Sequence, residues 1–193
     1  MSFIRTFIAV EATSEIRSRA VDLIDHLKVA GATVKWVQPS HLHLTLKFLG
    51  DVADAKIPGV CQAVLDAAVG LKPFSIECRG AGAFPALERP RTVWLGLGVG
   101  QEPCASLQAA IEERLEKLGF CKEARRFRGH LTLGRVRGGG PTARQLGQLI
   151  GQNVDFEAGK MTVSQVVVFS SELSRSGPTY TTLSRAKLGS SSA

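Results

Sequence analysis

The sequence has few of the features that mark an exported, membrane-bound or disulfide-stabilised protein. Its 193 residues include only four cysteines, and no two of them form a Cys-x-x-Cys pair. This spacing excludes a zinc ribbon and a dense disulfide framework, and it favours a reducing compartment. No apolar run approaches the roughly 20 residues that span a bilayer, and the first residues lack the long apolar region of a signal peptide. We therefore expect a cytoplasmic protein that has no membrane partner.

Aromatic residues are also scarce, at 6% of the chain, which leaves little material for an extensive base-stacking surface. Positive charge is more plentiful, because the formal net charge is +7 and indicates an anionic partner. The cations concentrate between residues 121 and 144, where Glu123 is the single acid among Lys122, Arg125, Arg126, Arg128, Arg135, Arg137 and Arg144. Without other context, such a charge run is most often a solvated loop.

The hydrophobic pattern predicts strands and helices interspersed along the whole chain. Strands are expected at 3–10, 34–37, 41–46, 74–84, 92–99, 130–136, 161–169 and 180–187. Helices are expected at 14–28, 57–68, 103–118 and 144–150, with Pro103 at the first position of the third helix. This order indicates an α+β protein with mainly antiparallel sheets that helices cover. The length allows one domain or two small lobes with a common core.

The most informative feature is a repeated motif. His-Leu-Thr-Leu occurs at 43–46 and again at 130–133, within the longer echoes HLHLTLKFLG and RGHLTLGRVRG. Because side chains alternate between the two faces of a strand, each copy presents its histidine and threonine on one face and its leucines on the other. If the leucines enter the core, two such strands side by side form a site of four polar side chains.

That set of side chains suits acid–base chemistry on a phosphate. Histidine is the side chain whose usual pKa, about 6.5, lets it accept or donate a proton near neutral pH. One imidazole can take a proton from water while the other gives a proton to a leaving oxygen, and such groups each supply about 10²–10⁴-fold in rate. Threonine hydroxyls can donate to the non-bridging phosphate oxygens, where negative charge accumulates.

With these motifs the chain resembles the 2H phosphoesterase superfamily, and within it the RNA 2′,3′-cyclic phosphodiesterases, which are also called 2′-5′ RNA ligases. Four further segments occur in the order typical of this family. They are FIAVE near the N-terminus, the Trp-Val-Gln-Pro segment that leads into the first motif at 36–50, Pro-Arg-x-x-Trp-Leu-Gly at 90–96, and Ser-Gly-Pro-x-Tyr at 176–180. The resemblance therefore covers nearly the whole chain.

The resemblance implies a role for each motif residue. His43 would give a proton to the leaving oxygen, His130 would activate water as a base, and Thr45 and Thr132 would hold the phosphate. Arg135 is similar to a phosphate-contacting arginine of the family, and Phe48 to a residue that contacts the base or ribose. Strict alternation, however, places Arg135 on the same face as the leucines, so the strand must twist or end near Gly134. Many relatives are expected to have proline where this chain has Gly129, and the glycine lowers the rigidity expected there.

The resemblance also implies a fold and a substrate. The fold would be bilobal, with two mainly antiparallel sheets, helices on the outside and a central groove, in one domain of residues 1–188 followed by a disordered tail at 189–193. The substrate would be RNA with a 2′,3′-cyclic phosphate end, tRNA fragments among them, and the product a 2′-phosphomonoester. The chain would act without a metal ion or cofactor, and 2′-5′ ligation would be a minor activity. A monomer is the default expectation, because the groove would form within one chain.

Two other interpretations remain open at this point. His41 and His43 stand two residues apart on an expected strand, which is a familiar metal-binding arrangement and would make the protein a metal-dependent phosphohydrolase. Alternatively, the basic loop could grip phosphates while Trp36, Phe48 or Phe127 stacks on bases, in an RNA-binding module without catalysis. The first interpretation leaves the second His-Leu-Thr-Leu copy unexplained, and the second has few aromatic residues to use.

Overall fold

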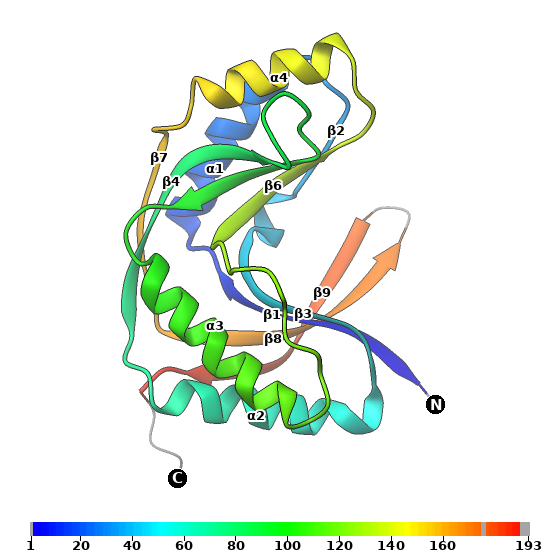
Figure 1. The fold of residues 1–193 in the computed structure, drawn as a ribbon, viewed down its shortest axis with the longest axis vertical. Helices are drawn as coiled ribbons and strands as arrows, with labels where there is room; N and C mark the ends of the chain where they lie inside the picture. Colours follow the sequence, from blue (N-terminus) through cyan, green and yellow to red (C-terminus); the bar gives the residue numbers. More distant parts are fainter. Residues whose placement is uncertain (1, 175–176, 190–193) are drawn as a thin grey trace.

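The computed structural model describes residues 2–174 and 177–189, which form one curled antiparallel sheet of nine strands and four α-helices (Figure 1). The strands are β1 (Phe3–Glu11), β2 (Val34–Trp36), β3 (His43–Ala53), β4 (Phe74–Phe84), β5 (Thr92–Leu97), β6 (His130–Val136), β7 (Glu157–Val163), β8 (Gln165–Ser174) and β9 (Gly177–Lys187). The helices are α1 (Ser14–Lys28), α2 (Ile57–Val69), α3 (Gln101–Glu116) and α4 (Pro141–Gly151). The predicted α+β class is confirmed.

The sheet has two halves that meet between the two motif strands. Its order is β7-β4-β5-β6-β3-β1-β8-β9, with β2 paired to β6. β3 and β6 pair at a single position, where Leu44 lies opposite Leu131. The two predicted sheets correspond to the halves on either side of this junction.

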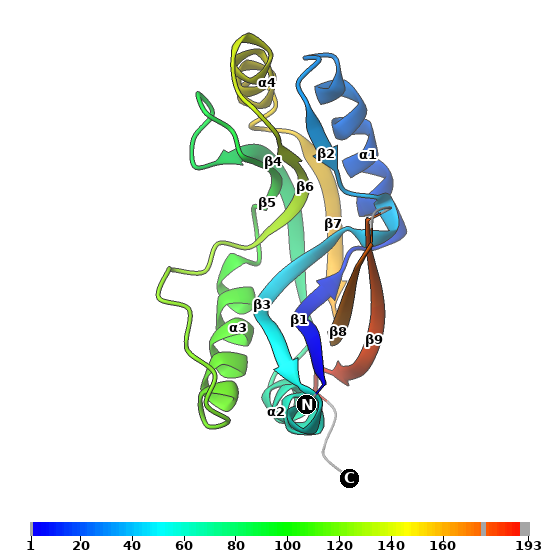
Figure 2. The ribbon, with the colours of Figure 1, turned by 90° about the vertical axis from the view of Figure 1, so that its right-hand side faces the viewer.

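The helices divide between the same two halves. Helix α1 contacts β7 and α4 contacts β4, whereas α2 contacts β9 and α3 contacts β3. The pairs lie at opposite ends of the molecule in both ribbon views (Figures 1 and 2). The extent of the single domain, 1–188, stays a prediction, and the predicted tail at 189–193 lies, apart from Gly189, outside the described residues.

Helix α1 follows the sequence pattern closely. The Thr13 hydroxyl accepts a hydrogen bond from the backbone N–H of Ile16 at 3.4 Å, as expected of an N-cap. The buried face repeats at helical spacing through Ile16, Ala20, Leu23, Ile24 and Leu27. The buried face therefore packs the helix onto β7 while its polar face meets solvent.

Some element boundaries differ from the prediction for physical reasons. Helix α3 begins at Gln101, so Pro103 is its third residue instead of its first; a proline is tolerated there because the first four N–H groups of a helix have no intrahelical partner. Helix α4 begins at Pro141, three residues early, for the same reason. The strand expected from His41 begins at His43, because His41 belongs to a 3-10 turn at Pro39–His41.

The prediction of one strand at 161–169 is wrong, because the segment is divided between β7 and β8. The chain turns at Ser164, and the two strands lie in opposite halves of the sheet. The pattern changes there: β7 alternates between buried and exposed positions, whereas Val166–Phe169 in β8 is buried throughout. A change from alternation to a continuous apolar run is the signal that sequence reasoning missed.

A small second cluster of buried residues lies apart from the main core. It consists of Phe7, Ala9, Val167 and Phe169, with Tyr180 packed against it. The Phe7 ring lies 4.9 Å from the His43 ring, so this cluster supports the first motif. Among the described residues, no helix is long and apolar enough to cross a membrane.

Candidate active site

The two motif strands place their polar side chains on a common face. Leu44 and Leu131 are fully buried and their neighbours Leu46 and Leu133 are buried, whereas the histidines and threonines are half-buried. Leu44 lies opposite Leu131 in an antiparallel pair, and in each strand the histidine and the threonine flank the paired leucine. The two motifs therefore meet at the first leucine of each, with a histidine and a threonine on either side of that leucine.

A β-bulge follows the threonine in both motifs. In β6, Thr132 pairs with Trp94 and Gly134 with Val93, so Leu133 is the extra residue. In β3, Thr45 pairs with Ala9 and Lys47 with Ile8, so Leu46 is the extra residue. A bulge shifts the alternation by one residue. The residues three positions after the threonines, Phe48 and Arg135, are therefore exposed instead of buried with the leucines.

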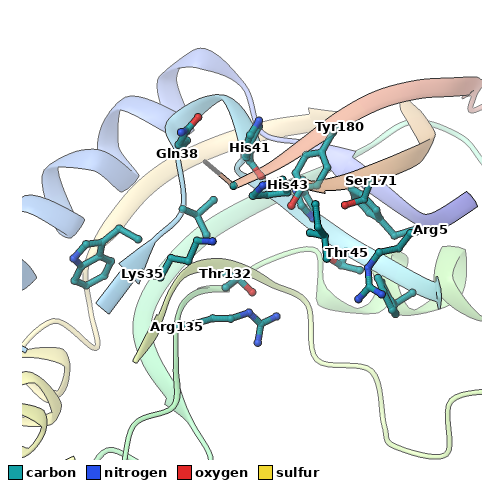
Figure 3. A pocket seen from close by; sticks show the side chains of 17 residues that line it. Arg5, Lys35, Gln38, His41, His43, Thr45, Thr132, Arg135, Ser171 and Tyr180 are labelled. Carbon is teal, nitrogen blue, oxygen red and sulfur yellow. Dashed lines mark hydrogen bonds between the residues drawn. The ribbon is translucent and has the colours of Figure 1, made fainter. Parts of the chain in front are cut away.

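A cavity of about 390 Å³ lies over these strands. Five of the six site residues expected from the sequence line it: His43, Thr45, Phe48, Thr132 and Arg135. Figure 3 shows Thr132 and Arg135 on the wall that faces His43 and Thr45. The sixth residue, His130, lines a neighbouring hollow instead, although it lies two residues from Thr132 on the same strand.

The cavity is electropositive. Arg5, Lys35 and Arg135 line it, and none of its 17 lining residues is aspartate or glutamate. The Arg5 guanidinium lies 4.7 Å from the centre of the Phe48 ring, a cation–π arrangement that holds both side chains at the rim. A cavity with several cations and no acid favours an anionic ligand.

Both histidine rings are oriented in the same way. Nδ1 of His43 lies 2.7 Å from the carbonyl oxygen of His41, and Nδ1 of His130 lies 2.7 Å from the carbonyl oxygen of Arg128. A carbonyl can only accept, so each Nδ1 carries the proton and donates it. In the neutral ring, Nε2 then has a free lone pair, which is the atom available to take or return a proton.

Burial lowers the pKa of both imidazoles below the usual histidine value. For His43 the loss of solvation is the largest cause, and the neighbouring His41 adds a smaller repulsion. For His130 burial is again the largest cause, and the charges of Arg135 and Arg128 lower the pKa further. The hydrogen bond to the carbonyl opposes the shift in both cases. Both rings are therefore neutral near pH 7 before an anion binds.

The backbone before each histidine is held by a different device. Before His43, the 3-10 turn is closed by the hydrogen bond from the His41 N–H to the Gln38 carbonyl at 2.8 Å. Before His130, Gln101 accepts from the Gly129 N–H at 3.2 Å and donates to the Phe127 carbonyl at 3.4 Å. Proline has no N–H to give, so Gly129 gains an anchor that proline would lack. Sequence reasoning did not identify Gln101.

Other cavity residues were also missed by sequence reasoning. Arg5 comes from β1, Lys35 from β2 and Tyr180 from β9, and the fold brings them to the motifs. Arg5 interrupts an otherwise apolar strand, which was a usable signal. Tyr180 closes the Ser-Gly-Pro-x-Tyr segment, of which Ser176 lies outside the described residues. Lys35 has no comparable signal.

The structure changes the arrangement that the metal-binding interpretation assumed for His41 and His43. His41 and His43 do not alternate along one strand, because His41 lies in the 3-10 turn, although the rings of both lie near that of Tyr180, at 4.7 and 5.6 Å between ring centres. Within residues 2–174 and 177–189, no group of three or more His, Cys, Asp or Glu side chains could hold a metal ion.

Comparison with known proteins agrees with the site. A family model described as LigT like Phosphoesterase matches residues 10–94 and 97–180, so each matched stretch contains one copy of the motif. The chain therefore belongs to the LigT-like phosphoesterase family.

Relatives with this similarity are found in archaea and bacteria. A Methanothermobacter thermautotrophicus protein named RNA 2′,3′-cyclic phosphodiesterase is 42% identical over 92% of this chain and 95% of its own length. An Aeropyrum pernix protein of the same name is 35% identical over 90% and 97%. Among solved structures, a Thermus thermophilus protein superposes with a TM-score of 0.77 at 27% identity, over 96% of this chain and 98% of the other.

Proposed function

We propose that this chain hydrolyses the 2′,3′-cyclic phosphate ends of RNA to 2′-phosphomonoesters, using His43 and His130 without a metal ion or cofactor. The observation that carries the proposal is the pair of imidazoles, each bonded through Nδ1 to a backbone carbonyl, on two strands that meet at the first leucine of each motif. The names of the relatives support RNA as the substrate class.

The proposed reaction uses both imidazoles in one displacement at phosphorus. Nε2 of His130 takes a proton from water as the water oxygen bonds to phosphorus. The bond between phosphorus and the ribose 3′ oxygen breaks, and Nε2 of His43, which is protonated once the anionic phosphate binds, gives its proton to that oxygen. Thr45 and Thr132 donate to the non-bridging oxygens, where charge develops. The net reaction adds one water and leaves a 2′-phosphate.

Two further residues have proposed substrate contacts. Arg135 has a guanidinium in the cavity beside Thr132 and supplies a bidentate partner for the phosphate. Phe48 is 52% exposed at the rim, and its ring, with Arg5 over it, supports contact with the base or ribose. The threonines and Arg135 therefore bind the phosphate while Phe48 binds the nucleoside.

The setting of the reaction is also proposed. Four free cysteines support a reducing, cytoplasmic location. Both halves of the sheet contribute residues to the cavity, which supports a monomer as the active unit. RNA fragments, tRNA fragments among them, are the proposed substrates, and a ribose hydroxyl that replaces water would give a minor 2′-5′ ligation.

Chelation provides the first test. In excess EDTA, the rate of hydrolysis of an oligoribonucleotide with a 2′,3′-cyclic phosphate end is expected to stay unchanged, because both proton transfers use side chains of the chain itself. Chromatography of the phosphomonoester product measures the rate. Loss of turnover that returns with a divalent metal would favour the His41 and His43 metal site. Inactivity throughout, with RNA binding retained, would favour the binding module.

The pH profile provides a second test. The pH dependence of kcat/KM reports the free enzyme, in which burial lowers the pKa of both histidines. The base must be neutral and the acid protonated, so the kcat/KM maximum is expected below the usual histidine pKa of about 6.5. The bound phosphate raises the pKa of both rings, so the kcat maximum is expected at higher pH. If the maxima of kcat/KM and kcat fell at the same pH, above about 6.5, the lowered pKa of the two buried histidines would be contradicted.

A further inference from the structure

A second hollow adjoins the site at His130. It has a volume of about 710 Å³ and is lined by residues of β4, β5 and the segment 126–130. His130 lines this hollow and Thr132 lines the cavity, although the two residues are about 7 Å apart along β6. A ligand that reaches from one space into the other therefore passes the motif residues.

The hollow is electropositive, like the cavity. Arg79, Arg126 and Arg128 line it, and none of its lining residues is aspartate or glutamate. Arg79 is already compensated, because it forms ion pairs with Asp155 and Glu157. The side chains of Arg126 and Arg128 are exposed and make no hydrogen bond or ion pair with another residue in the described part of the chain. Two guanidinium groups are therefore available for phosphate oxygens.

Aromatic rings line the same hollow as these arginines. Phe84, Trp94 and Phe127 line the hollow, and the Phe84 ring centre lies 5.1 Å from that of His130. Trp94 lies directly against Gly82, where a Cβ atom would be only 2.2 Å from the indole ring. Proteins that bind single-stranded nucleic acid use arginines to contact its phosphate backbone and aromatic rings to stack on its bases.

The loop 121–129, which carries the two arginines, is anchored at both ends. At its beginning, the Lys47 ammonium donates to the carbonyl of Cys121 at 2.7 Å. At its end, Gln101 bonds to the backbone of Phe127 and Gly129. An anchored backbone has less conformational entropy to lose when a ligand binds. The arginines are therefore presented at a prepared surface.

We propose that this hollow binds the RNA nucleotides that precede the terminal one, through Arg126, Arg128 and the neighbouring aromatic rings. The proposal rests on the proposed function for the placement of the cyclic end between His43 and His130. The attacking water occupies about 30 Å³, a small part of the hollow. The preceding nucleotides are covalently joined to the bound end, so their effective concentration at the hollow is high.

The test compares a long and a short substrate. The wild type is expected to have a higher kcat/KM for a cyclic-ended oligoribonucleotide than for a 2′,3′-cyclic mononucleotide. In Arg126→Gln/Arg128→Gln, the value for the oligoribonucleotide is expected to fall roughly tenfold. The value for the mononucleotide is expected to change much less, and only through the pKa of His130, which the charge of Arg128 lowers. The logarithmic salt dependence of oligoribonucleotide binding should fall by about 0.7 for each phosphate that the variant no longer neutralises.

The matched control is Arg137→Gln/Arg144→Gln. It removes the same charge from two exposed arginines that line neither space. An equal loss in the control, or an equal loss on both substrates in Arg126→Gln/Arg128→Gln, would overturn the proposal. The proposal would also be overturned if Arg126→Gln/Arg128→Gln slowed ligation to a separate RNA with a 5′-hydroxyl end while its kcat/KM for hydrolysis of the oligoribonucleotide stayed unchanged. The hollow would then bind a second RNA strand.

A binding measurement separates this proposal from the proposed function. If the wild type hydrolyses neither substrate, the proposed function fails. Fluorescence anisotropy with labelled single-stranded RNA that has an ordinary 3′-hydroxyl end still measures the affinity of the hollow for RNA. Weaker binding by Arg126→Gln/Arg128→Gln than by Arg137→Gln/Arg144→Gln supports the proposal, and equal binding overturns it.

Discussion

Replacing His43 or His130 with alanine is expected to lower kcat for cyclic phosphate hydrolysis by about 10²–10⁴-fold, because each variant loses one of the two proton transfers. The double variant should be little slower than the slower single variant, since the two groups act in one step. Single-turnover rates on a cyclic-ended oligoribonucleotide measure the effect. The control is His26→Ala, which removes an exposed histidine of α1. If either single variant retained a rate within a few fold of the wild type, the proposed mechanism would be wrong.

A modified substrate distinguishes the acid from the base. When sulfur replaces the 3′ bridging oxygen, the leaving thiolate needs no proton, because a thiol has a pKa of about 8.5. His43→Ala is expected to regain most of its rate on this substrate, whereas His130→Ala is not. Rescue of His130→Ala instead would reverse the two assignments while preserving the two-histidine reaction.

Replacing Glu112 with leucine is expected to destabilise the fold by about 3–5 kcal/mol, because it removes one partner of a buried ion pair. The Lys47 ammonium lies 2.8 Å from the Glu112 carboxylate, and both side chains are more than nine-tenths buried. Lys47 is buried because the bulge at Leu46 directs it inward toward α3. In the variant its remaining hydrogen bond goes to the Cys121 carbonyl. Urea unfolding followed by tryptophan fluorescence measures the change.

Two further variants test the cause of this loss. Lys47→Met/Glu112→Leu is expected to recover most of the stability, because apolar side chains replace both charges. Asp25→Asn breaks the exposed ion pair with Lys28 on α1 and should change the stability by less than about 1 kcal/mol. A double variant no more stable than Glu112→Leu would show that the loss comes from packing and not from the unpaired charge.

Alternation alone predicted the central part of the site. The leucines of each motif are apolar at every second position, so the opposite face had to carry the histidine and threonine, and the structure has this arrangement. Alternation failed at Arg135 because the bulge at Leu133 depends on how β5 pairs with β6. Arg135 lines the cavity, and the phosphate contact that the resemblance implies for it stays a prediction.

The parts that sequence reasoning missed depend on tertiary contacts. Arg5 and Lys35 reach the cavity because β1 pairs with β3 and β2 pairs with β6, and these pairings join segments distant in the chain. Gln101 lies at the first position of α3 and bonds to a segment 26 to 28 residues later. No local periodicity encodes such contacts, since periodicity describes only which face of its own element a residue occupies.

The pairing of Leu44 with Leu131 has a consequence for which isomer of the product is released. An antiparallel pair has a local two-fold axis, and rotation about this axis exchanges His43 with His130. The four motif residues are therefore equivalent, and alone they could open the cyclic phosphate toward a 2′- or a 3′-phosphate. The walls break this equivalence, because the cavity lies at His43 and the hollow at His130. A reversal of regiochemistry would need changes only in the walls that seat the nucleoside.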